Sequence, residues 1–494
     1  MNAPSPTPAF IANPVKQLLI DGRWVPAVGG ETIDSFNPAT GQVLVKLARG
    51  RQADVDLAVA SARRAFEGPW SRFTPAQRQQ VIMRLADLIA ENYDELTMLE
   101  SLDMGAPLHT RLRPTKNGLV QTVLYYAAQA RNITGEVMPN SLPGTVHSMV
   151  IKQPVGVIGG IIPWNGPMFS QMNVLGPVLA TGCTAVLKPA EDASLSILRT
   201  AELALEAGVP PGVINVVTGL GSEAGAAVAS HPGINRVAFT GSTITGREII
   251  KASAGNMKRL QLELGGKSPD IVFADADLDK AVPGVAMGVY TNSGQVCFAG
   301  TRIFVQRSIH EEVVERLGAF SKTLKVGDPL DPTTNLGPLI SQRQLDKVLG
   351  YLDQGPKEGA RLVTGGHRLG GELSNGYYVA PTVFGNVNNT MTIAREEIFG
   401  PVASVIPFDT VEEALALAND TEYGLGSGVW TTNMNTAMKM INGIQAGTVW
   451  VNCYGMLDPA VGFGDWKNSG YGWKGGQYQI DGYLAQKATY INVT

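Results

Sequence analysis

The sequence contains few of the residues that hold metal ions or build disulfide frameworks. Only three cysteines (Cys183, Cys297 and Cys453) and five histidines occur among its 494 residues. It has no Cys-x-x-Cys pair and no His-Glu-x-x-His segment, so no zinc signature is present and we expect no metal. A Gly-x-Ser-x-Gly segment is also absent, which argues against a serine hydrolase. Three cysteines without a framework favour a reducing, cytoplasmic setting.

The chain also lacks a marked excess of charge and long apolar runs. Its formal net charge is −4, so there is no basic footprint and nucleic acid is not an expected partner. The longest apolar runs, such as residues 155–162, are far shorter than the roughly 20 residues of a membrane span. Residues 1–14 have no basic region followed by an apolar one, so we expect neither a secretory signal nor a membrane partner.

Length and periodicity predict two α/β domains, because 494 residues exceed what one core accommodates. Short β-rich runs alternate with amphipathic helical runs, which indicates βαβ units and parallel sheets. In the first set we predict strands at 154–163, 184–190, 212–219 and 234–242, with helices at 194–208, 223–231 and 245–254. The alternation restarts after Gly266, with strands at 269–273, 301–306 and 403–408 and helices at 277–294, 309–324 and 411–420.

Two β-rich segments lie outside both sets, at residues 147–153 and 487–494. Strands without a place in either α/β domain suit a contact between subunits. We therefore expect a small β element for oligomerisation and a homo-oligomer, either a dimer or a tetramer.

The clearest dinucleotide motif is TGLGSEAGAA, in which Gly219-x-Gly221-x-x-Ala224 lies between a predicted strand and a predicted helix. A Rossmann fingerprint also needs an acidic residue about 20 positions later, at the end of the next strand. Here the next strand ends VAFTGS, without a carboxylate. The motif is therefore not expected to hold the pyrophosphate in the standard way.

Several single residues carry chemistry only in combination. Cys297, in TNSGQVCFAGTR, has no histidine nearby, and a lone cysteine is more often a buried apolar residue than a nucleophile. Glu263 stands beside two glycines that permit a close backbone approach. In FTGSTITG a helix is predicted to begin at a site suited to phosphate, and LKPAE places Lys188 near Glu191.

Taken together and in order, IPWNGP, KPAE, FTGST, LELGGKSP, GQVC and EEIFGPV resemble the NAD(P)-dependent aldehyde dehydrogenase superfamily, of the hydrolytic, non-acylating type. The resemblance extends from about Leu18 to the C-terminus. It implies a Rossmann-like NAD-binding domain (1–125 and 156–265), an α/β catalytic domain (266–465), and an oligomerisation element with a C-terminal strand (126–155 and 466–494).

The resemblance assigns three catalytic residues. Cys297 would attack the aldehyde carbon to give a thiohemiacetal, and Asn165 with the backbone N–H of Cys297 would stabilise the oxyanion. After oxidation to a thioester, Glu263 would act as general base on the hydrolytic water. Family members that transfer the acyl group to coenzyme A generally lack this glutamate, so a free carboxylic acid is the expected product.

The resemblance also assigns the cofactor site. Lys188 and Glu191 match the residues that bind the adenine ribose, and a carboxylate at Glu191 would repel a 2′-phosphate, which favours NAD over NADP. Ser242 matches the pyrophosphate ligand, and Glu397 and Phe399 match those holding the nicotinamide ribose. The full set of expected cofactor residues is Ile161, Pro163, Trp164, Asn165, Lys188, Glu191, Gly221, Phe239, Gly241, Ser242, Glu263, Leu264, Gly265, Glu397 and Phe399.

The expected substrate pocket departs from the family pattern. Small or polar residues stand where aromatic or bulky ones are frequent, while one phenylalanine is kept. The pocket residues are Gly166, Ser170, Asn173, Thr291, Leu457 and Phe463. A wider, more polar funnel predicts bulky aldehydes (aromatic, terpenoid or long-chain). The tail FGDWKNSGYGWKGG also departs, and Trp466 and Trp473 are assigned either to the site mouth or to a subunit contact.

Other functions are weighed against this one. A semialdehyde dehydrogenase of a catabolic pathway is an alternative within the family. A non-catalytic relative that acts as a binding or structural protein would be expected to lack Cys297, Glu263 or Asn165, and all three are present. A thiol hydrolase is disfavoured because no histidine is placed to pair with Cys297.

Overall fold

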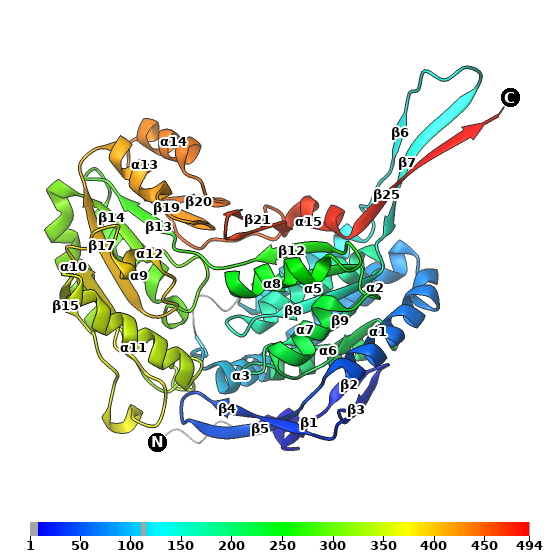
Figure 1. Cartoon of the computed structure of the whole chain (residues 1–494), viewed down its shortest axis with the longest axis horizontal. Helices are drawn as coiled ribbons and strands as arrows, with labels where there is room; N and C mark the ends of the chain where they lie inside the picture. Colours follow the sequence, from blue (N-terminus) through cyan, green and yellow to red (C-terminus); the bar gives the residue numbers. More distant parts are fainter. Residues whose placement is uncertain (1–7, 110–114, 494) are drawn as a thin grey trace.

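The computed structural model describes residues 8–109 and 115–493. Figure 1 shows two lobes side by side, each built on one large sheet, and a long β ribbon that projects away from the lobe containing α1 to α8. Among the described residues, no helix is long and apolar enough to cross a bilayer.

The first lobe contains an eight-stranded sheet in the order β23-β12-β11-β8-β9-β10-β2-β3. Its five central strands are parallel, which confirms the predicted sheet type, and the remaining strands add antiparallel edges. The strands are β2 (Leu18–Ile20), β3 (Arg23–Val25), β8 (Val157–Ile162), β9 (Thr184–Pro189), β10 (Ile214–Val216), β11 (Arg236–Thr240), β12 (Arg259–Glu263) and β23 (Gly470–Tyr471).

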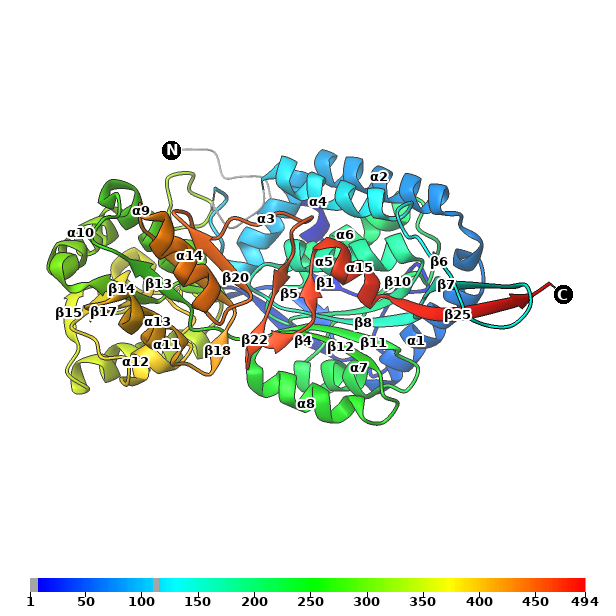
Figure 2. The same ribbon diagram turned by 90° about the horizontal axis from the view of Figure 1, so that it is seen from above.

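Helices cover both faces of this sheet, as Figure 2 shows from above. One apolar core lies under α2 (Pro75–Glu91), α3 (Tyr93–Met104), α4 (Lys116–Gln129), α5 (Pro167–Thr181) and α6 (Leu195–Glu206). The other lies under α1 (Gln52–Glu67), α7 (Ala226–Ser230) and α8 (Thr243–Ser253). A sheet covered on both faces explains why its strands are continuous apolar runs.

The second lobe contains a seven-stranded sheet in the order β15-β16-β17-β14-β13-β19-β20. Its strands are β13 (Pro269–Val272), β14 (Arg302–Gln306), β15 (Arg361–Thr364), β16 (Thr382–Gly385), β17 (Val402–Phe408), β19 (Gly426–Trp430) and β20 (Thr448–Val451). One face packs on α9 (Leu278–Tyr290) and α10 (His310–Thr323). The other packs on α11 (Gln342–Lys357), α12 (Thr392–Arg395), α13 (Val411–Asn419) and α14 (Met434–Gly443).

The chain also forms several smaller sheets of two or three strands. The projecting ribbon is antiparallel, in the order β25-β7-β6, and the other three-stranded sheet is ordered β1-β5-β4. Two short ribbons, β18-β22 and β21-β24, lie between the lobes. The bounds are β1 (Val15–Lys16), β4 (Thr32–Asn37), β5 (Gln42–Ala48), β6 (Glu136–Met138), β7 (Val146–Pro154), β18 (Tyr423–Gly424), β21 (Phe463–Gly464), β22 (Trp466–Lys467), β24 (Trp473–Lys474) and β25 (Leu484–Asn492).

The structure places the predicted outlying segments at 147–153 and 487–494 in β7 and β25, which pair along their whole length. Residue 494 itself lies outside the described residues. Within the predicted element at 466–494, however, β23 is an edge strand of the eight-stranded sheet, and α15 (Gly476–Gly482) packs against α5. This segment therefore joins the first lobe before the chain reaches the ribbon. The helix predicted at 277–294 ends at Tyr290 because the following residues turn left-handed.

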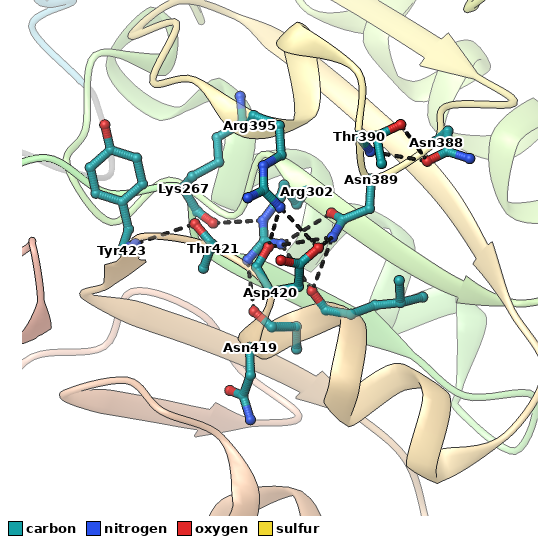
Figure 3. Close-up of polar contacts among 12 residues, drawn as sticks. Lys267, Arg302, Asn388, Asn389, Thr390, Arg395, Asn419, Asp420, Thr421 and Tyr423 are labelled. Atoms are coloured by element: carbon teal, nitrogen blue, oxygen red, sulfur yellow. Dashed lines mark hydrogen bonds and ion pairs between the residues drawn. The ribbon is translucent and has the colours of Figure 1, made fainter.

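A buried cation fixes the point at which the chain enters the second lobe (Figure 3). Arg302, at the start of β14, is completely buried, and its Nε donates to the carbonyl of Lys267 at 2.8 Å. Its Nη atoms donate to Asn389 Oδ1 at 3.2 Å and to the carbonyls of Leu417 and Ala418 at 3.1 and 2.8 Å. Burial lowers the pKa of Arg302 to about 9. The guanidinium thus fixes the segment through which the chain passes from the first sheet to the second.

We predict that Arg302→Lys lowers the free energy of unfolding by about 2–4 kcal/mol, because an ammonium cannot reach four acceptors with the geometry of a planar guanidinium. Urea unfolding followed by circular dichroism measures this change. The control is Arg307→Lys, whose exposed pair with Asp409 should contribute little. Equal losses in both variants would contradict the assignment of Arg302 as an anchor.

Candidate active site

A cavity of about 430 Å³ lies between the two lobes. Its walls come from α4, α5, the segment at 292–298, the loop at 455–463 and the turn at 474–475. Cys297 and Asn165 both line it. The cavity therefore brings together two residues that are separated by 132 positions of chain but were assigned to one site from the sequence.

The backbone before Cys297 adopts an unusual conformation. Asn292 and Ser293 have φ of 54°, and Gly294 has φ of 74°, so three successive residues are left-handed. Such conformations persist only where surrounding contacts hold them. Ser293 Oγ donates to the carbonyl of Gly337 at 2.7 Å, and Gln295 Oε1 accepts from Ile340 N at 2.9 Å. These bonds fix the loop that presents the thiol.

Glu263 belongs to the other lobe and lies beside Thr240, which lines the cavity. It ends β12 and is followed by Gly265 and Gly266. A Cβ on Gly266 would lie 2.3 Å from the carbonyl oxygen of Cys297, so only glycine allows the two segments to approach this closely. Glu263 is 3% exposed, and its charge acts on the thiol of Cys297.

Asn165 lies in the turn between β8 and α5. Its Nδ2 donates to the carbonyl of Gln295 at 3.0 Å, while Asn292 Nδ2 donates to the carbonyl of Asn165 at 3.1 Å. An amide nitrogen carries two N–H groups, so the bond to Gln295 leaves one for a ligand. The side chain is thereby held against the cysteine loop at the base of the cavity.

The electrostatics of the thiol are dominated by burial and nearby carboxyl groups. Burial raises the pKa of Cys297 to about 12, the positive charge of Lys474 opposes this, and Glu263, Glu397 and Asp465 add to the rise. Burial likewise raises the pKa of Glu263. The thiol is thus protonated at neutral pH unless positive charge enters the cavity.

Lys474 and Asp465 belong to this site but were not predicted from the sequence. Lys474 lines the cavity, and Asp465 interacts with Glu263 through their side chains. Both lie in the unusual tail FGDWKNSGYGWKGG, which was the only signal available. Of the two tryptophans in that tail, Trp466 is 51% exposed. Trp473 packs over β21, where a Cβ on Gly464 would lie 2.3 Å from its ring.

The residues expected at an adenine ribose lie together at the carboxyl end of β9. Lys188 is buried, and its Nζ donates to Glu191 Oε2 at 2.8 Å. Burial acts to raise the pKa of Glu191, but the charge and hydrogen bond of Lys188 outweigh it and the pKa is lowered. Gly221 N donates to Glu191 Oε1 at 3.4 Å, which places the glycine-rich turn beside this pair.

A second group lies at the start of α8. Ser242 caps this helix by accepting from Thr245 N at 3.2 Å, and the free N–H groups of a helix start suit phosphate oxygens. A Cβ on Gly241 would lie 2.4 Å from the ring of Phe239, so glycine keeps this turn open.

A third group lines the junction of the lobes. Glu397 Oε1 accepts from Gly266 N at 3.1 Å, and a Cβ on Gly265 would lie 2.7 Å from Glu397 Oε2. Trp164 meets Phe399 edge-on, with ring centroids 5.3 Å apart. The remaining expected cofactor residues lie at or just after the carboxyl ends of β8 and β12 in the eight-stranded sheet, and they are Ile161, Pro163 and Leu264. A buried lysine–glutamate pair, a helix start and glycine turns that a side chain would obstruct together fit a dinucleotide.

The cavity wall contains five of the six expected substrate residues, namely Gly166, Ser170, Asn173, Leu457 and Phe463. Thr291 is placed differently, because its hydroxyl donates to the carbonyl of Met287 within α9 and it does not line the cavity. Sequence reasoning missed further wall residues from α4, from α5, directly after the thiol and in the loop at 455–463, and they include Gln121, Thr122, Phe169, Phe298 and Asp458.

Within the part of the chain that the structure describes, no group of histidine, cysteine, aspartate and glutamate residues is arranged to hold a metal ion.

Comparisons with known proteins agree with this geometry. The sequence profile of the aldehyde dehydrogenase family matches residues 24–489. Aldehyde dehydrogenase 1 of Tanacetum cinerariifolium is 46% identical over 95% of this chain and 94% of its own length. The human mitochondrial aldehyde dehydrogenase is 43% identical over 99% and 94%. The NAD+ complex of an aldehyde dehydrogenase from Bacillus cereus superposes with a TM-score of 0.95 at 45% identity, covering 98% and 97%. The chain therefore belongs to the aldehyde dehydrogenase family.

Proposed function

We propose that this protein oxidises an aldehyde to the carboxylic acid with NAD, through a thioester on Cys297. The observation that carries the proposal is the placement of three residues. Cys297 and Asn165 line one cavity, and Glu263 lies beside the cavity-lining Thr240, where its charge acts on the thiol. Bound in the groups described above, the nicotinamide supplies the hydride acceptor that turns a thiohemiacetal into a thioester.

The roles of the protein groups follow from their placement. Cys297 loses its thiol proton to solvent and attacks the carbonyl carbon, and the oxyanion that forms takes hydrogen bonds from Asn165 and the backbone N–H of Cys297, each worth about 3–4 kcal/mol in a dry site. Glu263 then accepts a proton from water as the water oxygen bonds to the acyl carbon. The C–S bond breaks, the acid leaves, and the proton on Glu263 passes to the thiolate, which restores the thiol.

NAD is the proposed cofactor in preference to NADP. Glu191 is held ionised by Lys188 and stands beside the Gly221 turn. Its charge accepts hydrogen bonds from a ribose diol and repels a 2′-phosphate. The relatives solved as NAD+ complexes, from Bacillus cereus and Staphylococcus aureus, support a dinucleotide at this place.

Bulky or elongated aldehydes are the proposed substrates. The cavity is large, and nothing lies within 4 Å of a Cβ built on Gly166, so its mouth is open on the α5 side. The rings of Phe298 and Phe463, with centroids 5.6 Å apart, provide an apolar wall close to the thiol.

Homo-oligomer formation is also proposed, because the projecting ribbon exposes Val137 and Tyr490 by 82% and 64%.

Cys297→Ala should abolish NADH formation, with a loss of about 10³-fold or more because the nucleophile is removed. Absorbance at 340 nm with NAD, an aromatic aldehyde and no coenzyme A measures the activity. The control is Cys453→Ala, since Cys453 is the other half-buried thiol and lies outside the cavity wall. A Cys297→Ala enzyme as active as the native protein would refute the proposed chemistry.

Gly166→Phe should narrow the mouth and lower kcat/KM for bulky aldehydes by about tenfold or more, while acetaldehyde is little affected. Gly166→Ala is the matched control, because the added Cβ meets open space. A panel graded by chain length and aromaticity tests this. The substrate proposal fails if native kcat/KM is highest for acetaldehyde.

Glu191→Gln should raise kcat/KM for NADP relative to NAD by about tenfold, or about 1.4 kcal/mol. The variant removes the repulsive charge and leaves Lys188 free to attract a 2′-phosphate. Glu206→Gln, near the end of α6, removes a carboxylate elsewhere in the same lobe and serves as control. An unchanged cofactor ratio in Glu191→Gln would show that this carboxylate does not select the cofactor.

A further inference from the structure

The edge strand β23 brings Asp465 to Glu263. Gly470 lies opposite Glu263 in the antiparallel pairing of β23 with β12. Asp465 Oδ2 lies beside Gly470, 3.3 Å from where its Cβ would be. The loop between Asp465 and Gly470 is bonded to the segment that follows β12. Leu264 N donates to the carbonyl of Ser469, and Ser469 Oγ donates to the carbonyl of Gly265, both at 2.8 Å.

The two carboxyl groups meet in a buried place that is poor in donors. Both oxygens of Asp465 and Oε1 of Glu263 are buried, and no group among residues 8–109 and 115–493 donates a hydrogen bond to them. Burial together with the charge of Glu263 raises the pKa of Asp465 far above its usual range. Neighbouring buried carboxyl groups without donors resist ionising together, which favours a state in which one of them keeps its proton.

One cation faces this pair. Lys474, in β24, pairs with Phe463, which lines the cavity. Its Nζ donates to Thr240 Oγ1 at 3.4 Å, and Thr240 lies beside Glu263 in the register of β11 and β12. The positive charge of Lys474 acts on Cys297, Glu263 and Asp465 alike.

The backbone beside Lys474 is clamped to α5. Gly475 N donates to Gln479 Oε1 at 2.7 Å, and Gln479 Nε2 donates to the carbonyl of Asn173 at 2.6 Å. Tyr126 also donates from its hydroxyl to Gln479 Oε1, at 2.7 Å. These bonds fix the backbone next to Lys474, whose side chain lines the cavity.

We propose that Asp465 retains a proton at neutral pH and donates it to the Glu263 carboxylate, while Lys474 provides the positive charge that faces the Cys297 thiol. Asp465 is a positioning residue that acts through Glu263, and Lys474 acts on the thiol across the cavity. The groups facing the thiol are then two charges of opposite sign, from Glu263 and Lys474, together with the neutral acid of Asp465 and the carboxyl of Glu397.

The role in hydrolysis rests on the proposed function. As water attacks the thioester, its proton passes to Glu263, which Asp465 holds in place by the donated hydrogen bond. The C–S bond breaks with its electron pair on sulfur, and Lys474 balances the thiolate that results. The starting state returns when the proton on Glu263 passes to the Cys297 thiolate and the acid product releases its own proton to solvent.

The first test measures alkylation of Cys297 by iodoacetamide between pH 7 and 9, with the labelled peptide identified by mass spectrometry. Lys474→Met should slow alkylation about tenfold, because loss of the cation raises the thiol pKa by about one unit, whereas Lys474→Arg should remain near the native rate. Lys439→Met, which removes a surface charge paired with Glu412, is the control. Native rates in Lys474→Met would overturn the role of this lysine.

Asp465→Asn distinguishes a protonated from an ionised aspartate in the same assay. If Asp465 is a neutral donor, the amide replaces it without a change of charge, and the alkylation rate should stay within about twofold of the native rate. If Asp465 were ionised, its loss would remove a negative charge beside the thiol and speed alkylation about tenfold, which would overturn the proposal.

The second test is the pH profile of kcat. In Asp465→Leu the Glu263 carboxylate loses its donor, so the pKa of Glu263 rises and the acidic limb should move to higher pH. Asp465→Asn keeps a donor and should restore the native limb. An unmoved limb in Asp465→Leu would contradict the proposal. Absence of NADH from the native protein on every aldehyde would sink the proposed function, while alkylation would still decide the charges around Cys297.

Discussion

The close approach of Gly266 to the carbonyl of Cys297 is the constraint on which the site depends. Each lobe supplies half of the chemistry, since Glu263 ends a strand of the first sheet and Cys297 precedes β14 in the second. The two halves meet because a backbone without a side chain fits where a Cβ would lie 2.3 Å from oxygen. Arg302 fixes Lys267, the residue after Gly266, because its Nε donates to the carbonyl of Lys267.

A second constraint on the site is that carboxyl groups outnumber cations around the Cys297 thiol. The thiol is surrounded by the carboxyl groups of Glu263, Glu397 and Asp465, with Lys474 as the cation that opposes them. In a dry cavity such a cluster would be costly if every acid were ionised. Sharing a proton between two of the carboxyl groups reduces the net charge, and it does so without removing the base that hydrolysis requires.

Much of the fold could be predicted from the sequence, because buried parallel strands are continuous apolar runs and helix ends carry glycines. Gly208 follows α6 with φ of 94°, as its position predicts. The helices α1 to α4 were not predicted. α3, for example, buries Glu100 and Asp103 alongside its leucines, so its apolar periodicity is weak.

The candidate site likewise contains residues that could be located from the sequence and residues that could not. Residues carried by local motifs, such as Cys297 and the Lys188–Glu191 pair, could be located from the sequence. Asp465 and Lys474 could not, because their positions depend on β23 and β24, strands of only two residues whose pairing is long-range and leaves no pattern. Thr291 stays a predicted pocket residue, although its hydroxyl donates to the carbonyl of Met287 and a left-handed turn follows it.

The three left-handed residues before Cys297 have a consequence for how this protein diverges. A left-handed backbone is costly for most residues, so the loop that presents the thiol tolerates few substitutions. The opposite wall, formed by α5 and the loop at 455–463, is built from side chains and includes Gly166, where added atoms meet no neighbour. Single substitutions there alter which molecules enter without disturbing the reactive groups. Substrate range is thus free to drift among descendants of this sequence while the reaction is conserved.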